Sequence, residues 1–422
     1  MKEKNLNQWL QYLESLHPSE IDMGLARVRD VAQKMNLLKP AKTVVMVAGT
    51  NGKGSTVTLT SSILQQAGLK VGAFMSPHLH LYNERVKING VMLDDEDFIE
   101  SFKAIDKARG DILLTYFEVG TLSALYLFTK HQVDVAVLEV GLGGRLDAVN
   151  IVDADISVVT SIGLDHQDWL GNDLTQIAFE KAGIYRSEKP AICGERTPQA
   201  SLVNHAEGIG SALYVKGQAF DFEQNERDWN WTGLNKEGQV VKFENLPLPS
   251  LPIENAATVL QLLQFMPQEP SLIDIHKGIL SAKLSGRLEC VTKPFKAVLD
   301  VGHNPQAAQM LAKSLESQPV KGRRFALLAM LEDKDPAGVV EKLKPFIDSW
   351  YLAGLKGYRG QKVETLKAKV IERVNGFSCY ESVGEALDDL LLKMNEDDEL
   401  VVVGSFMVIA KTHEWLALHK SG

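Results

Sequence analysis

The sequence predicts an α/β protein, in which a mostly parallel, doubly wound sheet is followed by a smaller α/β domain of Rossmann-like type. Apolar runs rich in β-branched residues recur between stretches with helical periodicity, as expected when strands and helices alternate along a parallel sheet. A second series of this kind begins after residue 285. The predicted strands are residues 43–48, 71–74, 133–139, 156–162, 297–301, 325–330 and 400–404.

Two domains are expected, because a chain of 422 residues with 45% hydrophobic content exceeds what one core usually holds. The first domain is predicted to span residues 1–285 and the second residues 286–422. Between about 196 and 252 the pattern becomes irregular, with two tryptophans and a proline-rich stretch. This irregularity predicts a small β-rich appendage to the first domain.

The composition argues against several classes of protein. The 45 basic and 54 acidic residues give a net charge of −9, so nucleic acid is not an expected partner. The first residues lack an apolar signal region and the longest apolar runs contain charges, so neither secretion nor a membrane span is expected. Three widely spaced cysteines predict no disulfide frame or zinc site, and a cytoplasmic protein is expected.

A glycine-rich loop joins the first predicted strand to the helix that follows it. It reads Gly49-Thr50-Asn51-Gly52-Lys53-Gly54-Ser55, and the helix is predicted from near Ser55 to Gly68. Glycines let backbone N–H groups approach a phosphate, the helix N-terminus attracts negative charge, and Lys53 can neutralise it. The loop departs from the G-x-x-x-x-G-K-[ST] pattern, because Val47 occupies the first position and Gly54 separates Lys53 from Ser55. Nucleotide binding is the favoured interpretation, and a turn that only reverses the chain is the alternative.

Three further polar residues stand out by their position. Glu139 ends the predicted strand 133–139 and His166 follows the strand 156–162, so both lie at the carboxyl edge where open α/β sheets bind ligands. A solvated glutamate and a structural histidine are the alternatives. Lys181 lies in a helical stretch, where composition alone predicts a lysine on the surface.

Further short segments form an ordered series along the chain: Ser76-Pro77-His78-Leu79, Asn83-Glu84-Arg85, Thr115-Tyr116-Phe117-Glu118, residues 139–148, Asp165-His166, residues 180–184, Gly286-Arg287-Leu288-Glu289 and residues 300–305. Together with the glycine-rich loop, this series resembles the folate branch of the Mur ligase superfamily. The resemblance extends from the first helix to Gly404-Ser405-Phe406. Two departures, Val149 before Asn150 and Gly302 before His303, involve no group expected to carry chemistry.

The resemblance implies an ATP-dependent carboxylate–amine ligase with a P-loop ATPase domain and a C-terminal ligase domain. The γ-phosphoryl group of ATP would pass to a substrate carboxylate, and the amine of L-glutamate would attack the resulting acyl phosphate. The implied acids are dihydropteroate and reduced folates, so that the enzyme would make both dihydrofolate and folylpolyglutamates. We expect it to act as a monomer.

Several alternatives stay open at this point. An enzyme of the same chemistry could act only as a folylpolyglutamate synthase. A protein of the same fold could use a peptidoglycan precursor, although no UDP-binding domain is recognised before residue 43. A P-loop regulatory ATPase would bind a partner without ligating anything. A scaffold role would leave the polar residues at the strand ends unexplained.

The resemblance also assigns nucleotide and metal sites. Two magnesium ions are implied, one held by Ser76 and Glu139 and the other by His166, and a role for potassium (K+) is left open. Lys181 matches a lysine that is often carbamylated in relatives. Arg287 would reach phosphate and Asp300 the ribose, so that catalysis would require domain closure. The implied ATP-binding residues are Thr50, Asn51, Gly52, Lys53, Gly54, Ser55, Asn255, Arg287 and Asp300, and the implied catalytic residues are Lys181, His166, Glu139 and His303.

The remaining assignments concern adenine and the pterin-bearing acid. Asn255 would contact adenine or cap a helix N-terminus, and both interpretations are kept. Tyr116 and Phe117 could supply an aromatic face and Asp147 could accept pterin N–H groups, with ordinary packing as the alternative. The residues implied for the acid are Asp22, Met23, Gly24, Leu25, Thr115, Tyr116, Phe117, Glu118, Leu146, Asp147 and Ala148.

Overall fold

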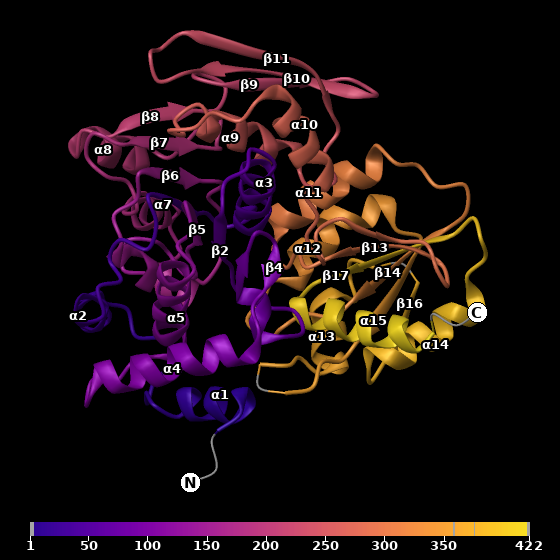
Figure 1. The fold of residues 1–422 in the computed structure, drawn as a ribbon. Helices are drawn as coiled ribbons and strands as arrows, with labels where there is room; N and C mark the ends of the chain where they lie inside the picture. The colour runs from indigo at the N-terminus through magenta and orange to yellow at the C-terminus, as the bar shows by residue number, and fades with distance from the viewer. Residues whose placement is uncertain (1–3, 358, 375, 420–422) are drawn as a thin grey trace. The chain divides into compact units, whose positions relative to one another are not determined.

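The computed structural model describes residues 4–357, 359–374 and 376–419, and it has the predicted α/β fold (Figure 1). The chain divides into two compact units, Met1–Lys283 and Leu284–Gly422. The boundary predicted from the sequence lies between residues 285 and 286. Each unit has its own central sheet and its own helices, and they are described in turn.

The first unit is built on an eight-stranded sheet. Its strand order is β4-β3-β2-β5-β1-β6-β7-β8, and the six strands from β2 to β8 are parallel, with β3 and β4 added antiparallel at one edge. The central strand β1 is buried along its whole length, as its valine-rich sequence predicts for a parallel strand covered on both faces. The strands are β1 Thr43–Ala48, β2 Val71–Phe74, β3 Val86–Ile88, β4 Val91–Met92, β5 Val135–Glu139, β6 Ile156–Val159, β7 Pro190–Cys193 and β8 Ala212–Val215.

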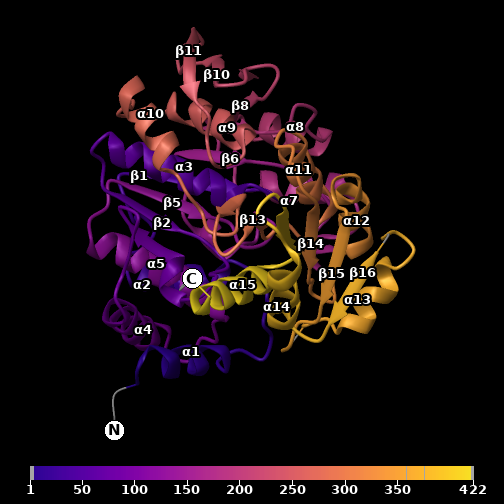
Figure 2. The same cartoon turned by 90° about the vertical axis from the view of Figure 1, so that its right-hand side faces the viewer.

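The helices of the first unit pack in groups. The helix α3 packs against α9 and α10, as the two views of the fold show (Figures 1 and 2), while α1, α2, α4 and α5 contact one another. In α3, Gly68 follows the last turn with a φ of +82°, which suits glycine as the predicted stop of this helix. The helices are α1 Leu6–Glu14, α2 Ala26–Lys34, α3 Lys53–Gln66, α4 Asp95–Arg109, α5 Tyr116–Lys130, α6 Gln167–Leu170, α7 Leu174–Ala182, α8 Ala200–Gly208, α9 Ile253–Leu263, α10 Leu272–Ser281, and the short 3-10 helices η1 Tyr82–Arg85 and η2 Ala148–Ile151.

A separate three-stranded antiparallel sheet, in the order β11-β10-β9, lies within the region predicted as an appendage. Its strands are β9 Asp221–Gln224, β10 Asp228–Leu234 and β11 Val240–Pro247. Trp229 and Trp231 are fully buried, and the indole N–H of Trp231 donates to the Ala257 carbonyl at 3.0 Å, which ties this sheet to α9. The irregular region 196–252 also contains α8 and β8, and β8 belongs to the main sheet, so the added sheet is smaller than that region.

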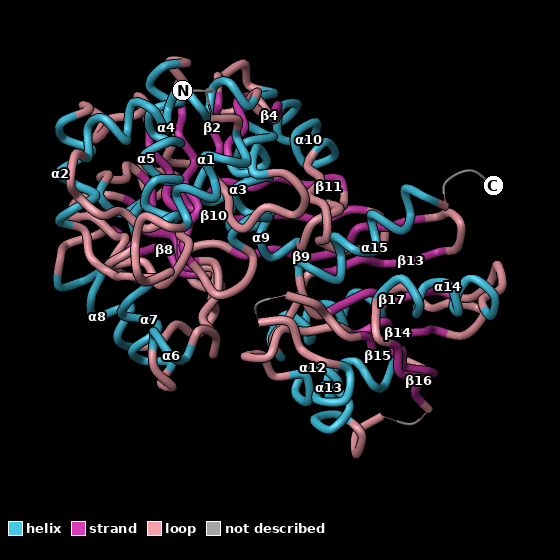
Figure 3. Tube along the Cα trace, turned by 90° about the horizontal axis from the view of Figure 1, so that it is seen from below, coloured by secondary structure: helices cyan, strands magenta, loops and turns pink. Residues whose placement is uncertain are grey.

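The second unit has a six-stranded sheet in the order β12-β13-β17-β14-β15-β16, parallel except for β12. Figure 3 shows α12 and α13 together on one side of it and α14 and α15 together on the other. Within the residues described, no helix is long and apolar enough to cross a membrane. The elements are β12 Glu289–Val291, β13 Lys296–Asp300, β14 Arg324–Leu328, β15 Ser349–Ala353, β16 Phe377–Tyr380, β17 Glu399–Val403, α11 Pro305–Glu316, α12 Pro336–Leu343, the 3-10 helix η3 Lys344–Phe346, α13 Val363–Val370, α14 Val383–Lys393 and α15 Phe406–Leu418.

Candidate active site

The glycine-rich loop connects the carboxyl end of β1 to the first turn of α3. Gly52 precedes the helix with a φ of +86°, a conformation that glycine adopts without steric cost. The Lys53 ammonium donates to the Gly49 carbonyl at 2.9 Å and to the Thr50 carbonyl at 3.3 Å, so this cation is held over the loop. A lysine and a helix N-terminus at one turn form a site suited to the phosphates of a nucleotide.

The residues that follow β6 fix the shape of the loop. The Thr160 hydroxyl donates to the Asn51 carbonyl at 2.6 Å, and the Asn51 N–H donates to the Ser161 hydroxyl at 3.0 Å. A Cβ atom on Gly49 would lie 1.8 Å from the Thr160 hydroxyl oxygen, which explains why this position needs glycine. Thr160 and Ser161 were not among the predicted site residues; both fall inside the predicted strand 156–162, whereas β6 ends at Val159.

Asn255 reaches the same loop from α9. Its side-chain amide donates to the Gly52 carbonyl at 3.1 Å. The N-cap of α9 is Pro252, and Asn255 lies in the first turn of the helix, so the alternative that Asn255 caps the helix is wrong. The amide is instead buried against the loop, where it contacts backbone that sequence spacing could not reveal.

Glu139 and Ser76 come together beside the loop. Glu139 is the last residue of β5, only 5% exposed, and its carboxylate accepts the Ser76 N–H at 3.0 Å. In the described ranges no group of three or more His, Cys, Asp or Glu side chains could hold a metal by itself. Magnesium usually takes one or two carboxylates and completes its shell with phosphate oxygens and water, so a buried carboxylate beside a serine fits such an ion.

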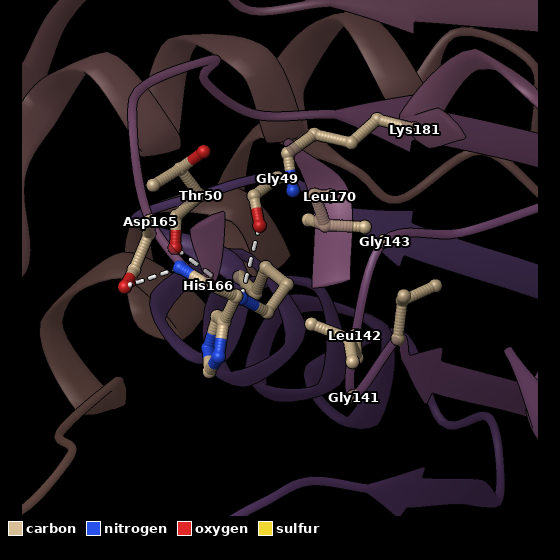
Figure 4. A pocket seen from close by; sticks show the side chains of 11 residues that line it. Gly49, Thr50, Gly141, Leu142, Gly143, Asp165, His166, Leu170 and Lys181 are labelled. Atoms are coloured by element: carbon tan, nitrogen blue, oxygen red, sulfur yellow. Dashed lines mark hydrogen bonds between the residues drawn. The ribbon is translucent and has the colours of Figure 1, made fainter. Parts of the chain in front are cut away.

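A pocket opens next to the loop and is lined by residues from four parts of the chain (Figure 4). Lys181, in α7, is only 4% exposed, so the prediction of a surface lysine from composition is wrong. Burial, and then the nearby charge of Lys53, lower the pKa of Lys181 to about 7. The lining residues are Gly49, Thr50, Lys53, Val140, Gly141, Leu142, Gly143, Asp165, His166, Leu170 and Lys181.

His166 and Asp165 occupy the rim of this pocket. His166 is exposed, precedes α6 and has a φ of +51°, and its backbone N–H donates to the Asp165 carboxylate at 2.9 Å. Asp165 also raises the pKa of Lys181, against the effect of burial. The structure therefore brings the predicted residues Lys53, His166 and Lys181 to one pocket and adds Asp165 to them.

The segments predicted for the acid meet around α5. Thr115 and Glu118 form a capping box at the start of this helix, and the Arg27 guanidinium donates to Glu118 at 2.9 Å and also pairs with Asp22. Phe117 lies so close to Gly141 that a Cβ atom there would be 2.5 Å from the ring. Arg27, which sequence analysis did not select, thus links two of the predicted segments.

Asp147 stabilises the loop after β5 through hydrogen bonds to its backbone. Its carboxylate accepts the Leu142 N–H at 2.7 Å and the Val149 N–H at 3.0 Å. Burial raises the pKa of Asp147 to about 6, against the lowering effect of these backbone donors. The same loop passes close to the first acid segment, because a Cβ atom on Gly143 would lie 3.8 Å from the Met23 methyl group.

Comparison with known proteins identifies the family and the fold of the chain. The Mur ligase middle domain matches residues 47–246, and the glutamate ligase domain of Mur ligases matches residues 286–406. The dihydrofolate synthase/folylpolyglutamate synthase of Escherichia coli (strain K12) is 46% identical over 417 residues, which are 99% of this chain and 97% of that protein. The chain belongs to the Mur ligase family.

Two solved structures extend the comparison. E. coli FolC in complex with DHPP and ADP is 46% identical, covers 99% of each chain and superimposes with a TM-score of 0.94. A Yersinia pestis bifunctional folylpolyglutamate synthase/dihydrofolate synthase, complexed with AMPPNP and a Mn ion, is 43% identical. It covers 99% of this chain and 98% of its own, with a TM-score of 0.92.

The part matched by the glutamate ligase domain of Mur ligases holds the remaining predicted residues. The Asp300 carboxylate accepts the Leu288 N–H at 3.1 Å and the Gly302 N–H at 2.7 Å. Burial raises the pKa of Asp300, while the charge of Arg287 acts in the opposite direction. His303 Nδ1 lies 3.0 Å from the Val301 carbonyl. Arg287, Asp300 and His303 therefore form one cluster within the second unit.

Proposed function

We propose that this chain is an ATP-dependent ligase that adds L-glutamate to dihydropteroate and to reduced folates. The observation that carries the proposal is that the phosphate loop and a buried carboxylate meet at one edge of the sheet. The strands β1 and β5 are neighbours, Val47 is aligned with Glu139, and Glu139 accepts the Ser76 N–H. The similarity to dihydrofolate synthase/folylpolyglutamate synthases along the whole chain supplies the identity of the acids.

The residues of the first unit bind and align the reactants. The loop N–H groups and Lys53 bind the phosphates of ATP, and Glu139 with Ser76 would hold one magnesium ion and His166 a second. Bound magnesium neutralises charge on the phosphoryl oxygens. The acid carboxylate attacks the γ-phosphorus and ADP leaves; the amine of glutamate then attacks the acyl carbon and expels phosphate. The protein provides position and positive charge rather than a nucleophile.

Lys181 is proposed to act in its carbamylated form. Reaction with carbon dioxide requires the neutral amine, and a pKa of about 7 leaves a large share of this amine neutral near physiological pH. The carbamate is an anion, and it would lie in a pocket that Lys53 and Asp165 both line. Lys53 favours the carbamate over the ammonium form, whereas Asp165 acts in the opposite direction and burial disfavours either charge.

The remaining roles rest on the resemblance and on local contacts. We place the pterin-bearing acid among the segments 22–25, 115–118 and 146–148, because Arg27 joins the first to the second and Met23 approaches the loop that carries the third. Asn255 belongs to the nucleotide site through its contact with Gly52. For Arg287, Asp300 and His303, a role at the nucleotide rests on the resemblance alone.

A coupled assay of ADP release tests this function. Purified protein receives ATP and magnesium with either dihydropteroate or tetrahydrofolate, each with and without L-glutamate. We expect glutamate-dependent release of ADP with both acids. Release with tetrahydrofolate alone would mean a folylpolyglutamate synthase only, and ADP release that ignores glutamate and both acids would mean a regulatory ATPase.

A further inference from the structure

Arg85, at the end of η1, is a buried cation without a counter-charge. It is 8% exposed, and within the part of the chain that the structure describes its guanidinium has no ion-pair partner. Its Nε–H donates to His78 Nδ1 at 2.9 Å, and none of the described residues accepts a hydrogen bond from its two terminal nitrogens. A buried charge is costly unless it is paired, so this arrangement is suited to bind an anionic group.

The nearest side chains do not supply that anion. His78 accepts the hydrogen bond through Nδ1, so this ring nitrogen carries no proton and the ring is neutral. The Glu84 carboxylate is engaged by the backbone N–H groups of residues 79, 80 and 81 at 2.7, 2.7 and 2.8 Å. The rings of Tyr82 and Tyr116 lie 5.4 and 5.5 Å from the guanidinium, which offers a modest cation–π attraction but no negative charge.

Arg85 is connected to two parts of the candidate active site, the pair Ser76 and Glu139 and the start of α5. Its carbonyl accepts the Met75 N–H at 2.9 Å, directly before Ser76, whose own N–H is bound by Glu139. On the other side, Tyr116 begins α5 and precedes Phe117, which packs on the Gly141 loop. The backbone of Arg85 is therefore bonded to the segment that carries Ser76, while its guanidinium lies beside Tyr116 at the start of α5, one of the segments assigned to the acid.

We propose that Arg85 binds the α-carboxylate of the glutamyl group on a reduced folate, and this inference rests on the function proposed above. A glutamyl group carries two carboxylates joined by a short carbon chain, so when one is activated the other must lie close by. Dihydropteroate has only the carboxylate that reacts. A guanidinium matches a carboxylate with two parallel hydrogen bonds, which suits the two unused terminal nitrogens of Arg85. Arg85 would then contribute to the binding of reduced folates and would make no such contact with dihydropteroate.

The test compares the two acids in the same variants. Steady-state rates with dihydropteroate and with tetrahydrofolate are measured for the wild type, Arg85→Gln and Arg85→Lys, with ATP and L-glutamate varied in turn. We expect Arg85→Gln to raise KM for tetrahydrofolate about tenfold or more relative to its effect on KM for dihydropteroate. Arg85→Lys keeps the charge but cannot form two parallel hydrogen bonds, so its KM for tetrahydrofolate should lie between those of the wild type and Arg85→Gln.

A matched control separates this effect from general damage. Arg109→Gln removes a half-buried guanidinium that is already paired, with Asp106 at 2.6 Å and the Tyr12 hydroxyl at 2.8 Å, and it should not change the ratio of the two KM values. An equal rise in KM for both acids, or a rise confined to L-glutamate or ATP, would overturn the proposal. A wild type that uses neither acid would instead overturn the function on which the proposal rests.

Discussion

The side-chain amide of Asn255 donates a hydrogen bond to the carbonyl of Gly52 across 3.1 Å, although 203 positions separate the two residues in the sequence. Gly52 immediately precedes α3, and α3 packs against the helix that carries Asn255. The glycine-rich turn before α3 is therefore fixed by contacts from two elements, from Asn255 of α9 and from the residues after β6.

Replacement of Asn255 by alanine should weaken ATP binding more than it slows chemistry. Loss of one hydrogen bond of this kind costs about 0.5–1.5 kcal/mol, so KM for ATP should rise about two- to tenfold with a smaller change in kcat. Steady-state kinetics with ATP varied measures this. Thr258→Val, one turn further along α9, is the control, because its hydroxyl donates only within the helix, to the Glu254 carbonyl at 2.8 Å. A fall in kcat at constant KM for ATP would contradict this role.

Alanine at position 52 should be more damaging than the loss of Asn255. Its Cβ atom would lie 2.7 and 2.8 Å from the Asn255 amide atoms, at a φ of +86° that alanine tolerates poorly. We expect ATP affinity, measured by calorimetry, to fall more than tenfold. The double variant Gly52→Ala/Asn255→Gly removes the clash but not the strain, so it should recover part of the loss.

The control for this pair is Gly68→Ala. Gly68 has nearly the same φ, +82°, but a Cβ atom there would meet nothing within 4 Å. This variant should lower the thermal midpoint while leaving ATP affinity as in the wild type. Equal losses of ATP affinity in Gly52→Ala and Gly68→Ala would mean that general destabilisation by a strained backbone, rather than the contact between residue 52 and Asn255, lowers the affinity.

The parts of the site that follow directly from strand order could be predicted from the sequence. The run 43–48 and the loop after it identify β1 and its turn to α3, and Glu139 closes a run of buried β-branched and apolar residues. Parallel strands place such termini at one edge, so the meeting of Glu139 with the loop follows from the fold class. The alternation of strands and helices likewise predicted a mostly parallel sheet in each half of the chain, but the predicted runs cover only β1, β2, β5, β6, β13, β14 and β17 and leave out the other strands of the two sheets.

Contacts made by residues distant in sequence could not be predicted in this way. The burial of Lys181 depends on packing around α7, and one lysine in a helical pattern carries no sign of it. Arg27 forms an ion pair with Glu118, which lies 91 positions away in the sequence, and the residues around Arg27 do not indicate this contact. The uncompensated charge of Arg85 is visible only when the absence of an acidic neighbour within the described residues can be checked in three dimensions.

The carbamylation proposed for Lys181 predicts that activity depends on dissolved carbon dioxide. Protein stripped of carbon dioxide at mildly acidic pH should lose most of its ligase activity and recover it when bicarbonate is added, because the carbamate is labile. Lys181→Ala should be inactive and should not respond to bicarbonate. Lys189→Ala, which removes an exposed lysine paired with Asp155, serves as the control. Full activity of Lys181→Ala, together with an unmodified lysine by mass spectrometry, would exclude the carbamate.

Asp147 should make the stability of the protein fall as pH rises through the weakly acidic range. Its pKa is raised from 3.8 to about 6 in the folded protein, so between about pH 4 and pH 6 the folded state holds a proton that the unfolded state has released. The free energy of unfolding contributed by this group is therefore complete below pH 4 and decreases as pH rises to 6. The asparagine variant has no such titration.

The measurement is urea unfolding of the wild type and Asp147→Asn at several pH values between 4 and 7. The wild type should lose about 1–3 kcal/mol relative to Asp147→Asn across this range. Asp153→Asn is the control, because it removes a carboxyl group whose side chain is 81% exposed. A difference between wild type and Asp147→Asn that stays constant from pH 4 to pH 7 would mean that the hydrogen bonds from Leu142 and Val149 outweigh burial and keep this carboxyl ionised throughout.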